Sequence, residues 1–340
     1  MIIGHGDDAW EYATAIRADF SSNVRYGPLD PGLMRHLQER VAAVTHYPEP
    51  AAQSLQQAAA EAYGVPGERV LVTNGATEAI YLIAQAFRDR PVSIYVPAFA
   101  EYEDACAIQG MKIAFRDWED LRAGSLPDTG LVFLCNPNNP TGAAITLEMF
   151  SRYPDALFVV DESYIEFTRA TESILGKAYP NVLVLRSLTK SCRIPGLRIG
   201  LVAGDEIILD RLRAVKMPWS VNRLAIEAGR YIFQHLADFA VPVEALVAQT
   251  AAWREELRAA TGTHEDPKAG WRVRETDTHY FLIDTPAPLK MRLLTDYGLL
   301  VRDASNFRGL GPNVLRVACQ SAEHNYLLTE ALRECAWTGR

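Results

Sequence analysis

The sequence has few cysteines, and nothing in their spacing suggests a structural role. Five cysteines are scattered over 340 residues, and no two of them form a C-x-x-C pair. The sequence therefore predicts neither a zinc site nor a disulfide framework, and no other metal site is expected. Cysteines that form no disulfide framework are typical of proteins in a reducing cytosol, so we expect a cytoplasmic protein.

Long apolar runs and an excess of positive charge are also missing. No run approaches the roughly 20 residues of a membrane span. The N-terminus has no basic segment followed by an apolar one, so neither a signal peptide nor a membrane partner is expected. The chain carries 34 basic and 42 acidic residues, a net charge of −8. This balance argues against nucleic acid as a partner but still allows a local basic pocket for a small anion.

The chain does contain short apolar runs that alternate with helical patterns. Most of these runs are continuously apolar, which is typical of strands buried on both faces. We therefore predict an α/β fold, a mostly parallel sheet with helices on both faces. The expected strands are Val70–Thr73, Ser93–Val96, Leu131–Cys135, Ala156–Val160, Val182–Leu185 and Ile199–Val202.

The pattern changes after Pro218, where long helices precede shorter strand-like runs at 280–283, 299–301 and 314–317. This change predicts a second, smaller α+β domain. The expected organisation has three parts: an N-terminal arm and first helix that pack with the small domain, a large domain that binds a cofactor, and the small C-terminal domain. Their predicted bounds are 1–46, 47–237 and 238–340.

Polar residues follow several of the predicted strands at the point where each strand ends. Asn136-Pro-Asn-Asn-Pro-Thr-Gly142, Asp161-Glu-Ser-Tyr164 and Arg186-Ser-Leu-Thr-Lys190 each come directly after a buried strand. In open α/β sheets, ligands bind beyond the carboxyl ends of the strands. We therefore expect these segments to meet around one ligand.

One set of these residues predicts a phosphate site. A glycine turn that opens a helix lets backbone N–H groups face an anion, and the helix dipole favours negative charge there. Hydroxyl groups and a guanidinium would add further hydrogen-bond donors. The residues expected at the phosphate are Gly75, Ala76, Thr77, Ser187, Thr189 and Arg198.

A second set predicts carbonyl and ring chemistry. Lys190 is a candidate amine nucleophile that would form a Schiff base with a carbonyl. Asp161 can pair with a protonated ring nitrogen, which makes the ring a better electron sink. Asn139 and Tyr164 can hydrogen-bond a phenolic oxygen, and Tyr102 can stack on an aromatic ring. A phosphate, an aldehyde and a pyridinium together describe pyridoxal 5′-phosphate (PLP).

Taken singly, each of these residues has an ordinary structural explanation. The segments 136–142, 161–164 and 186–190 followed by Arg198, in this order, are together specific for one superfamily. The chain resembles the class I/II aminotransferase superfamily of PLP-dependent, fold-type-I enzymes. The resemblance implies that Lys190 carries the cofactor and that Arg316 binds a carboxylate or phosphate. It also implies that Tyr47 reaches the cofactor phosphate of a second subunit, so the expected assembly is a homodimer.

Within this superfamily, the chain is most similar to the branch that decarboxylates L-threonine O-3-phosphate to (R)-1-amino-2-propanol O-2-phosphate in cobalamin biosynthesis. The segments Asp19-Phe-Ser-Ser-Asn23, Ile194-Pro-Gly-Leu-Arg198 and Met217-Pro-Trp-Ser-Val-Asn222 carry this similarity. The implied substrate is a small phosphorylated amino acid. The implied substrate-binding residues are His5, Asn23, Arg302 and Arg316, with the role of Arg25 left open.

Two alternatives stay open at this point. A histidinol-phosphate aminotransferase would use the same site, and Tyr164 is common among aminotransferases, whereas the decarboxylase branch often has phenylalanine there. Arg25-Tyr26 and Cys192-Arg193 also differ from the decarboxylase pattern. A non-catalytic, PLP-binding regulatory module is the third hypothesis, and the presence of both Lys190 and Arg316 argues against it.

Overall fold

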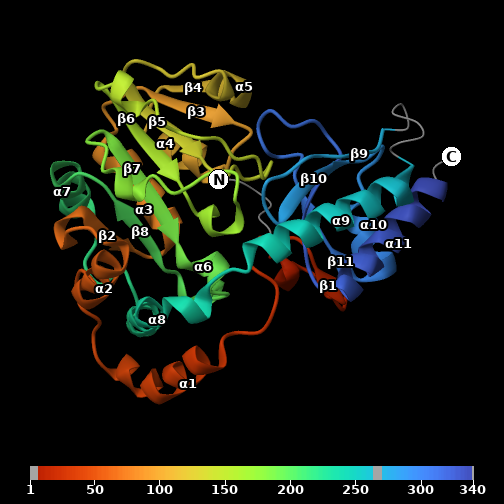
Figure 1. Ribbon diagram of the computed structural model, residues 1–340, viewed down its shortest axis with the longest axis horizontal. Helices are drawn as coiled ribbons and strands as arrows, with labels where there is room; N and C mark the ends of the chain where they lie inside the picture. The colour runs from red at the N-terminus through yellow and green to blue at the C-terminus, as the bar shows by residue number, and fades with distance from the viewer. Residues whose placement is uncertain (1–6, 263–269, 339–340) are drawn as a thin grey trace.

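The computed structural model describes residues 7–262 and 270–338. Its seven-stranded and four-stranded sheets lie side by side along the long axis of the molecule, and a third sheet has only two strands (Figure 1). The larger sheet is built from the middle of the chain, and the smaller one from the C-terminal part. The predicted combination of a large, mostly parallel α/β part and a smaller α+β part is confirmed.

The large sheet has the strand order β2-β8-β7-β6-β5-β3-β4. β8 runs antiparallel to both of its neighbours, and the remaining pairs are parallel. The strands are β2 (Val70–Thr73), β3 (Val92–Val96), β4 (Ile113–Asp117), β5 (Gly130–Cys135), β6 (Ala156–Asp161), β7 (Val182–Ser187) and β8 (Gly200–Ala203).

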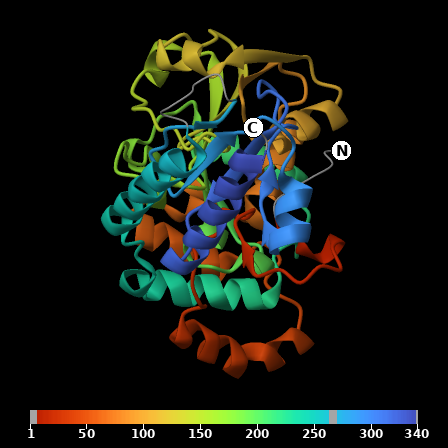
Figure 2. The same ribbon diagram turned by 90° about the vertical axis from the view of Figure 1, so that its right-hand side faces the viewer.

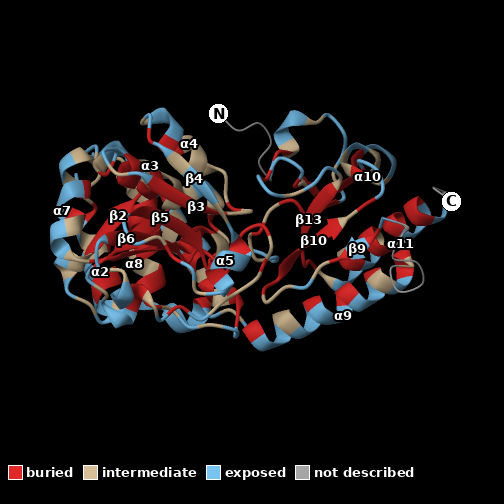
Figure 3. Ribbon diagram, turned by 90° about the horizontal axis from the view of Figure 1, so that it is seen from above, coloured by how far each residue is buried: buried red, intermediate tan, exposed pale blue. Residues whose placement is uncertain are grey.

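Helices cover both faces of this sheet, and the side chains of the strands alternate between them. In β5, Leu131 and Phe133 belong to the apolar cluster under α3 (Gly75–Ala86), α4 (Glu101–Ile108) and α7 (Glu206–Val215). The intervening Val132 and Leu134 belong to the opposite cluster, with Trp118 of α5 (Trp118–Arg122). Burial on both faces explains why these strands have continuously apolar sequences (Figure 3).

The small sheet is antiparallel, with the order β12-β13-β10-β9. Its strands are β9 (Arg272–Val273), β10 (Tyr280–Asp284), β12 (Arg302–Asp303) and β13 (Val314–Ala318). The helices of this part are α9 (Val243–Thr261), α10 (Lys290–Tyr297) and α11 (Ala322–Thr338). They are nearest to the viewer when the molecule is seen from the end that carries the small sheet (Figure 2). Within the described ranges, no helix combines the length and the apolar character that crossing a membrane would require.

The N-terminal arm contacts both parts of the molecule. β1 (Ala18–Asp19) pairs in parallel with β11 (Leu299–Leu300), and Phe20 stacks on Trp253 with ring centroids 5.8 Å apart. The arm then reaches the large part. There α1 (Pro31–Arg40) packs on α8 (Arg223–Gln234), next to α2 (Gln53–Tyr63). The sequence analysis expected residues 1–46 to pack with the small domain; the described part of the arm contacts both parts, and the domain bounds stay a prediction.

The sequence analysis did not anticipate four strands. β4 lies at the edge of the large sheet with exposed side chains, including a partly exposed Phe115, so its residues do not form a continuous apolar run. β1, β9 and β12 are two residues long, which is too short for a periodic pattern to be visible.

We predict that Gly200→Ala destabilises the fold by about 1–3 kcal/mol. A Cβ atom at Gly200 would lie 2.3 Å from the carbonyl carbon of Gly75 and 2.5 Å from the nitrogen of Ala76. These backbone atoms cannot give way without displacing the N-terminus of α3. Urea unfolding measures the loss, with Gly176→Ala as the control, because no atom lies within 4 Å of a Cβ there. Equal unfolding midpoints for the two variants would contradict this prediction.

Candidate active site

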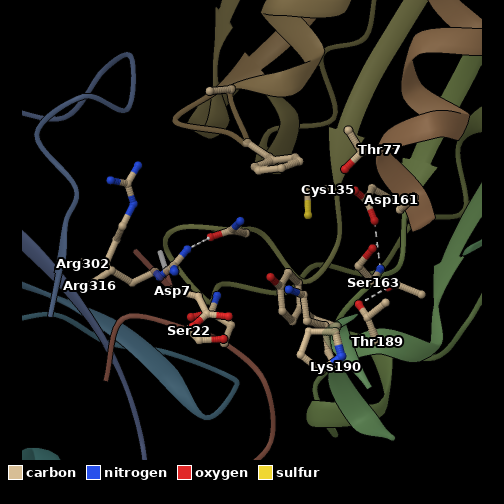
Figure 4. Close-up of a pocket in the computed structure, with 18 of the residues that line it drawn as sticks. Asp7, Ser22, Thr77, Cys135, Asp161, Ser163, Thr189, Lys190, Arg302 and Arg316 are labelled. Atoms are coloured by element: carbon tan, nitrogen blue, oxygen red, sulfur yellow. Dashed lines mark hydrogen bonds between the residues drawn. The ribbon is translucent and has the colours of Figure 1, made fainter. Parts of the chain in front are cut away.

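A cavity of about 380 Å³ lies where the carboxyl ends of β5, β6 and β7 face the small sheet. It collects most of the side chains that the sequence analysis singled out. Arg302 and Arg316 lie on one side of the cavity, and Asp161, Thr189 and Lys190 lie on the other (Figure 4). The predicted residues that line it are Asn23, Ala76, Thr77, Asn139, Asp161, Tyr164, Ser187, Thr189, Lys190, Arg198, Arg302 and Arg316.

The expected phosphate end is built around the start of α3. Gly75, the first residue of α3, has φ +78°, and a Cβ there would lie 2.5 Å from Nη2 of Arg198. The guanidinium of Arg198 can lie across the helix N-terminus because residue 75 has no side chain. Beside it, the hydroxyl groups of Ser187 and Thr189 are 2.7 Å apart. Arg198 is partly buried, and this burial lowers the pKa of its guanidinium from the ordinary value.

Lys190 lies on the short helix α6 (Leu188–Ser191), directly after β7. Burial, reinforced by the positive charges of Arg316 and Arg198, lowers the pKa of its amine to about 8. At about pH 8, half of the amine is therefore unprotonated and able to attack a carbonyl, far more than for a lysine with an ordinary pKa.

Asp161 is the last residue of β6 and is almost fully buried. Its Oδ1 accepts a hydrogen bond from the backbone N–H of Ser163 at 2.9 Å. Its Oδ2 accepts one from the hydroxyl of Tyr102 at 2.6 Å. The two bonds hold the carboxylate in one orientation at the cavity wall.

The structure corrects the expectation that Tyr102 stacks on a bound ring. Tyr102 is fully buried, does not line the cavity, and stacks instead on Phe133 with ring centroids 5.2 Å apart. Phe99, just before α4, lines the cavity. Tyr102 faces inward from α4 towards Asp161, and burial together with that carboxylate raises the pKa of Tyr102 well above its ordinary value. It therefore stays a hydrogen-bond donor.

Asn139 and Arg316 join the two sheets across the cavity. Nη1 of Arg316 donates to Oδ1 of Asn139 at 2.6 Å, and Nη2 donates to the carbonyl oxygen of Ser21 at 2.6 Å. Tyr164 lies beside this pair, and burial raises its pKa to about 12 against the lowering effect of Arg316. Its hydroxyl is therefore protonated over the physiological pH range, and the Asn23 side chain lies next to it.

Arg302 and Arg316 are directly paired across the antiparallel strands β12 and β13. Residues opposite each other in such a pair point to the same face, so two cations lie side by side. Both are buried, and burial together with Arg316 lowers the pKa of Arg302 to about 10. Among the described residues, no carboxylate forms an ion pair with either guanidinium. An anionic ligand would compensate two adjacent buried cations that lack such a partner.

Four of the predicted residues that the structure describes do not line the cavity: Gly75 and Tyr102, discussed above, and Tyr47 and Arg25. Tyr47 is 86% exposed and contacts Trp219 on the surface, with ring centroids 5.9 Å apart. The guanidinium of Arg25 donates to the carbonyl oxygen of Ala240 and does not line the cavity. His5 lies outside the described residues.

The cavity also contains residues that the sequence analysis missed. Ser163 lies inside the predicted segment 161–164, and Phe99 lies three residues before the predicted Tyr102, so both could have been identified from their positions in the sequence. Asp7 and the two loop residues Asn306 and Phe307 carry no such signal, because only the tertiary structure brings them to the cavity.

The donors present fit PLP. A helix N-terminus, two hydroxyl groups and Arg198 suit its phosphate, Lys190 suits its aldehyde, and Asp161 suits its ring nitrogen. Nε of Arg316 is buried and has no hydrogen-bond partner among the residues that the structure describes. An unsatisfied buried donor at a cavity is a position that a ligand can satisfy.

We predict that the apoprotein captures PLP faster as the pH rises to about 8, and at a constant rate above it. Below this pKa the Lys190 amine is an ammonium without a free electron pair, and above it the amine is neutral. Borohydride trapping followed by peptide mass spectrometry, between about pH 6 and pH 10, measures the rate and locates the attachment. Lys190→Ala should abolish trapping, and the control Lys216→Ala should not. A rate that keeps rising up to the ordinary lysine pKa, or attachment elsewhere, would refute the assignment.

We predict that Tyr102→Phe lowers kcat/KM about 10-fold, because a hydrogen bond to a charged group contributes about 1.5 kcal/mol or more. The substitution removes only the hydroxyl that holds Asp161. The matched control is Tyr95→Phe, which removes another buried hydroxyl, one that donates to the Ser125 carbonyl oxygen away from the cavity. Steady-state assays at saturating PLP distinguish the two variants, and an equal effect of both would show that Tyr102 has no special role.

Comparison with known proteins supports one family. The sequence profile of aminotransferase class I and II matches residues 19–333. The threonine-phosphate decarboxylase of Salmonella typhimurium is 33% identical, with 97% of this chain and 95% of the relative covered. A histidinol-phosphate aminotransferase of Desulfitobacterium hafniense is 29% identical, with coverage of 94% and 91%. The crystal structure of L-threonine-O-3-phosphate decarboxylase from Porphyromonas gingivalis matches with a TM-score of 0.87 and 35% identity, with coverage of 94% and 99%.

The profile match spans both sheets, and two of these relatives exceed 30% identity over nearly the whole chain. Similarity of this extent confirms the fold-type-I architecture that the sequence predicted, and the cavity lies at the strand ends where such a fold places its ligand. The chain belongs to the class I and II aminotransferase family of PLP-dependent enzymes.

Proposed function

We propose that the protein decarboxylates L-threonine O-3-phosphate to (R)-1-amino-2-propanol O-2-phosphate, with PLP as cofactor. The observation that carries this proposal is the buried pair Arg302 and Arg316, aligned across β12 and β13 and unpaired with any carboxylate of the described residues. An amino acid that carries both a carboxylate and a phosphate supplies the negative charge that two buried guanidinium groups require. Two threonine-phosphate decarboxylases, 33% and 35% identical to this chain, support the choice of substrate.

The cofactor-binding roles follow from the positions of the side chains. Arg198, Ser187, Thr189 and the start of α3 would hold the phosphate, and Asp161 would hold the ring nitrogen. Asn139 and Tyr164 would face the ring oxygen, and Phe99 would provide the aromatic wall. When bound, PLP supplies an electron-accepting ring that stabilises the electron pair left at Cα when a bond to that atom breaks.

The protein's own contribution is orientation and proton control. In the proposed reaction, the bond between Cα and the carboxylate breaks, CO2 leaves, and Cα gains one proton. Arg302 and Arg316 would bind the anionic groups of the substrate and so would fix the orientation of the bond between Cα and the carboxylate. Orientation of this kind can lower a barrier by about 7–11 kcal/mol. Lys190 Nζ, with a pKa of about 8, can hold a proton and deliver it to Cα.

The proposal includes a homodimer. Tyr47, Trp219 and Met217 form an exposed apolar group, with Tyr47 86% and Met217 73% exposed. A second subunit would cover such a surface, and the family resemblance implies that Tyr47 contacts the partner's cofactor phosphate. We also propose a cytoplasmic location, supported by five cysteines that are all unpaired and buried.

A histidinol-phosphate aminotransferase is the second candidate. A relative of that activity is 29% identical over 94% of this chain, and Tyr164 lines the cavity, as expected for aminotransferases. In that reaction Lys190 would remove the proton from Cα instead of supplying one, so the two functions differ in which bond to Cα breaks.

The test is a mass-spectrometric assay of the PLP-loaded protein with L-threonine O-3-phosphate and no keto acid. We expect aminopropanol phosphate and CO2 to form. Arg302→Lys, which keeps the charge but loses the planar fork, should raise KM for this substrate about 10-fold or more. No product in this assay, combined with amino transfer from histidinol phosphate when 2-oxoglutarate is added, would refute the decarboxylase and support the aminotransferase.

A further inference from the structure

The loop 304–313 joins β12 to β13 and extends from the small sheet towards the large sheet (Figure 1). Two of its residues, Asn306 and Phe307, line the cavity. Nη2 of Arg302 donates to Oδ1 of Asn306 at 2.9 Å, and the Arg302 guanidinium lies 5.3 Å from the centre of the Phe307 ring. The conformation of this loop therefore sets the position of the Arg302 guanidinium.

On the side of the small sheet, the loop is anchored by packing. Phe307 and Ala304 belong to a small apolar cluster with Leu282 and Val314. The backbone N–H of Ala304 donates to the carbonyl oxygen of Val314 at 2.7 Å. These contacts fix the base of the loop but do not reach the large sheet.

Arg308 makes the contact with the large part of the molecule. Its Nε donates to Oε2 of Glu103 at 3.0 Å and its Nη2 donates to Oε1 at 2.7 Å, a two-pronged pair. The same guanidinium lies 4.0 Å from the centre of the Phe115 ring on β4. The hydrogen bonds to Glu103 raise the pKa of Arg308 above its ordinary value, so the charge is present at every physiological pH.

Glu103 directly follows Tyr102 on α4. One helix therefore holds Asp161 through the hydroxyl of Tyr102 and holds the loop through the carboxylate of Glu103. Because a helix transmits position rigidly, the expected cofactor carboxylate and the expected substrate guanidinium are fixed to one common element.

We propose that Arg308 is a positioning residue for recognition of the substrate phosphate: its contacts with Glu103 and Phe115 hold the loop 304–313 against the large part and so fix Arg302. This inference rests on the proposed function and takes Arg302 as the guanidinium that binds the substrate phosphate. Arg308 itself does not line the cavity, so it acts through the loop and not by touching the ligand.

The pair should have a local effect rather than a global one. The side chains of Arg308 and Glu103 are 50% and 32% exposed, and exposed pairs contribute little to the stability of a fold. We therefore expect Arg308→Gln to leave the thermal midpoint unchanged while it loosens the loop.

The first measurement is hydrogen exchange of the PLP-loaded protein, which does not depend on activity. Arg308→Gln and Glu103→Gln should each speed exchange in peptides that cover 304–313 about 3- to 5-fold, the scale of one well-formed surface pair. The charge-swapped double variant Glu103→Arg/Arg308→Glu should return at least half of the protection. Arg122→Gln, which breaks the exposed pair with Glu119 on α5, is the matched control and should change nothing there.

The second measurement is ligand affinity, followed by calorimetry with inorganic phosphate and with L-threonine O-3-phosphate as probes. Each of the two single variants should weaken the binding of both probes about 3- to 5-fold, as it speeds the exchange. Each should also raise KM for L-threonine O-3-phosphate and leave kcat unchanged. Affinity for PLP should not change.

The outcomes separate the two proposals. Unchanged exchange in 304–313 would overturn the positioning role of Arg308, and so would faster exchange with unchanged affinity for phosphate. Failure of the wild-type protein to turn over L-threonine O-3-phosphate would instead overturn the proposed function, while exchange and phosphate binding would still decide the role of Arg308.

Discussion

Four cationic side chains line one cavity, and the arrangement around them has to compensate for the cost of burying their charges. Burial lowers the pKa values of Lys190, Arg198, Arg302 and Arg316 alike. Buried charge is tolerated only where hydrogen bonds and opposite charge compensate for it. The cavity lies between the large and the small sheet, where backbone carbonyl oxygens, hydroxyl groups and amide side chains can accept hydrogen bonds from these cations. It suits ligands that carry phosphate and carboxylate groups.

Support for these charges comes from elements that are distant in the sequence. Arg316 on β13 is held by Asn139, which follows β5, and by the carbonyl oxygen of Ser21 in the N-terminal arm. Asp161 is held by Tyr102 of α4, whose neighbour Glu103 binds the loop that carries Asn306. The cofactor side and the substrate side are therefore not independent, and a substitution at their junction should alter the fit of the substrate before it alters the stability of the fold.

The sequence predicted most of the large sheet because strands buried on both faces produce continuous apolar runs. It also identified most of the residues that line the cavity, because polar residues directly after such strands lie at the carboxyl ends of the sheet, where ligands bind. It failed where the signal was weak or depended on orientation. β12 is only two residues long, so it leaves no periodic pattern. The sequence around Tyr102 does not show that its ring packs on Phe133, away from the cavity, while Phe99 lines the cavity.

By itself, the sequence determined the α/β fold, the family and the cofactor, and it predicted Lys190, Asp161 and Arg198 as residues that bind PLP, since these follow from local patterns and from the residue types that PLP requires. Only the tertiary structure decided how those groups are supported. It aligned Arg302 with Arg316 across two strands, brought Asp7 and the loop 304–313 to the cavity, and left Tyr47 on the surface. The physical reason is that pairing between distant strands and the inward or outward direction of a side chain depend on long-range packing, which no local pattern encodes.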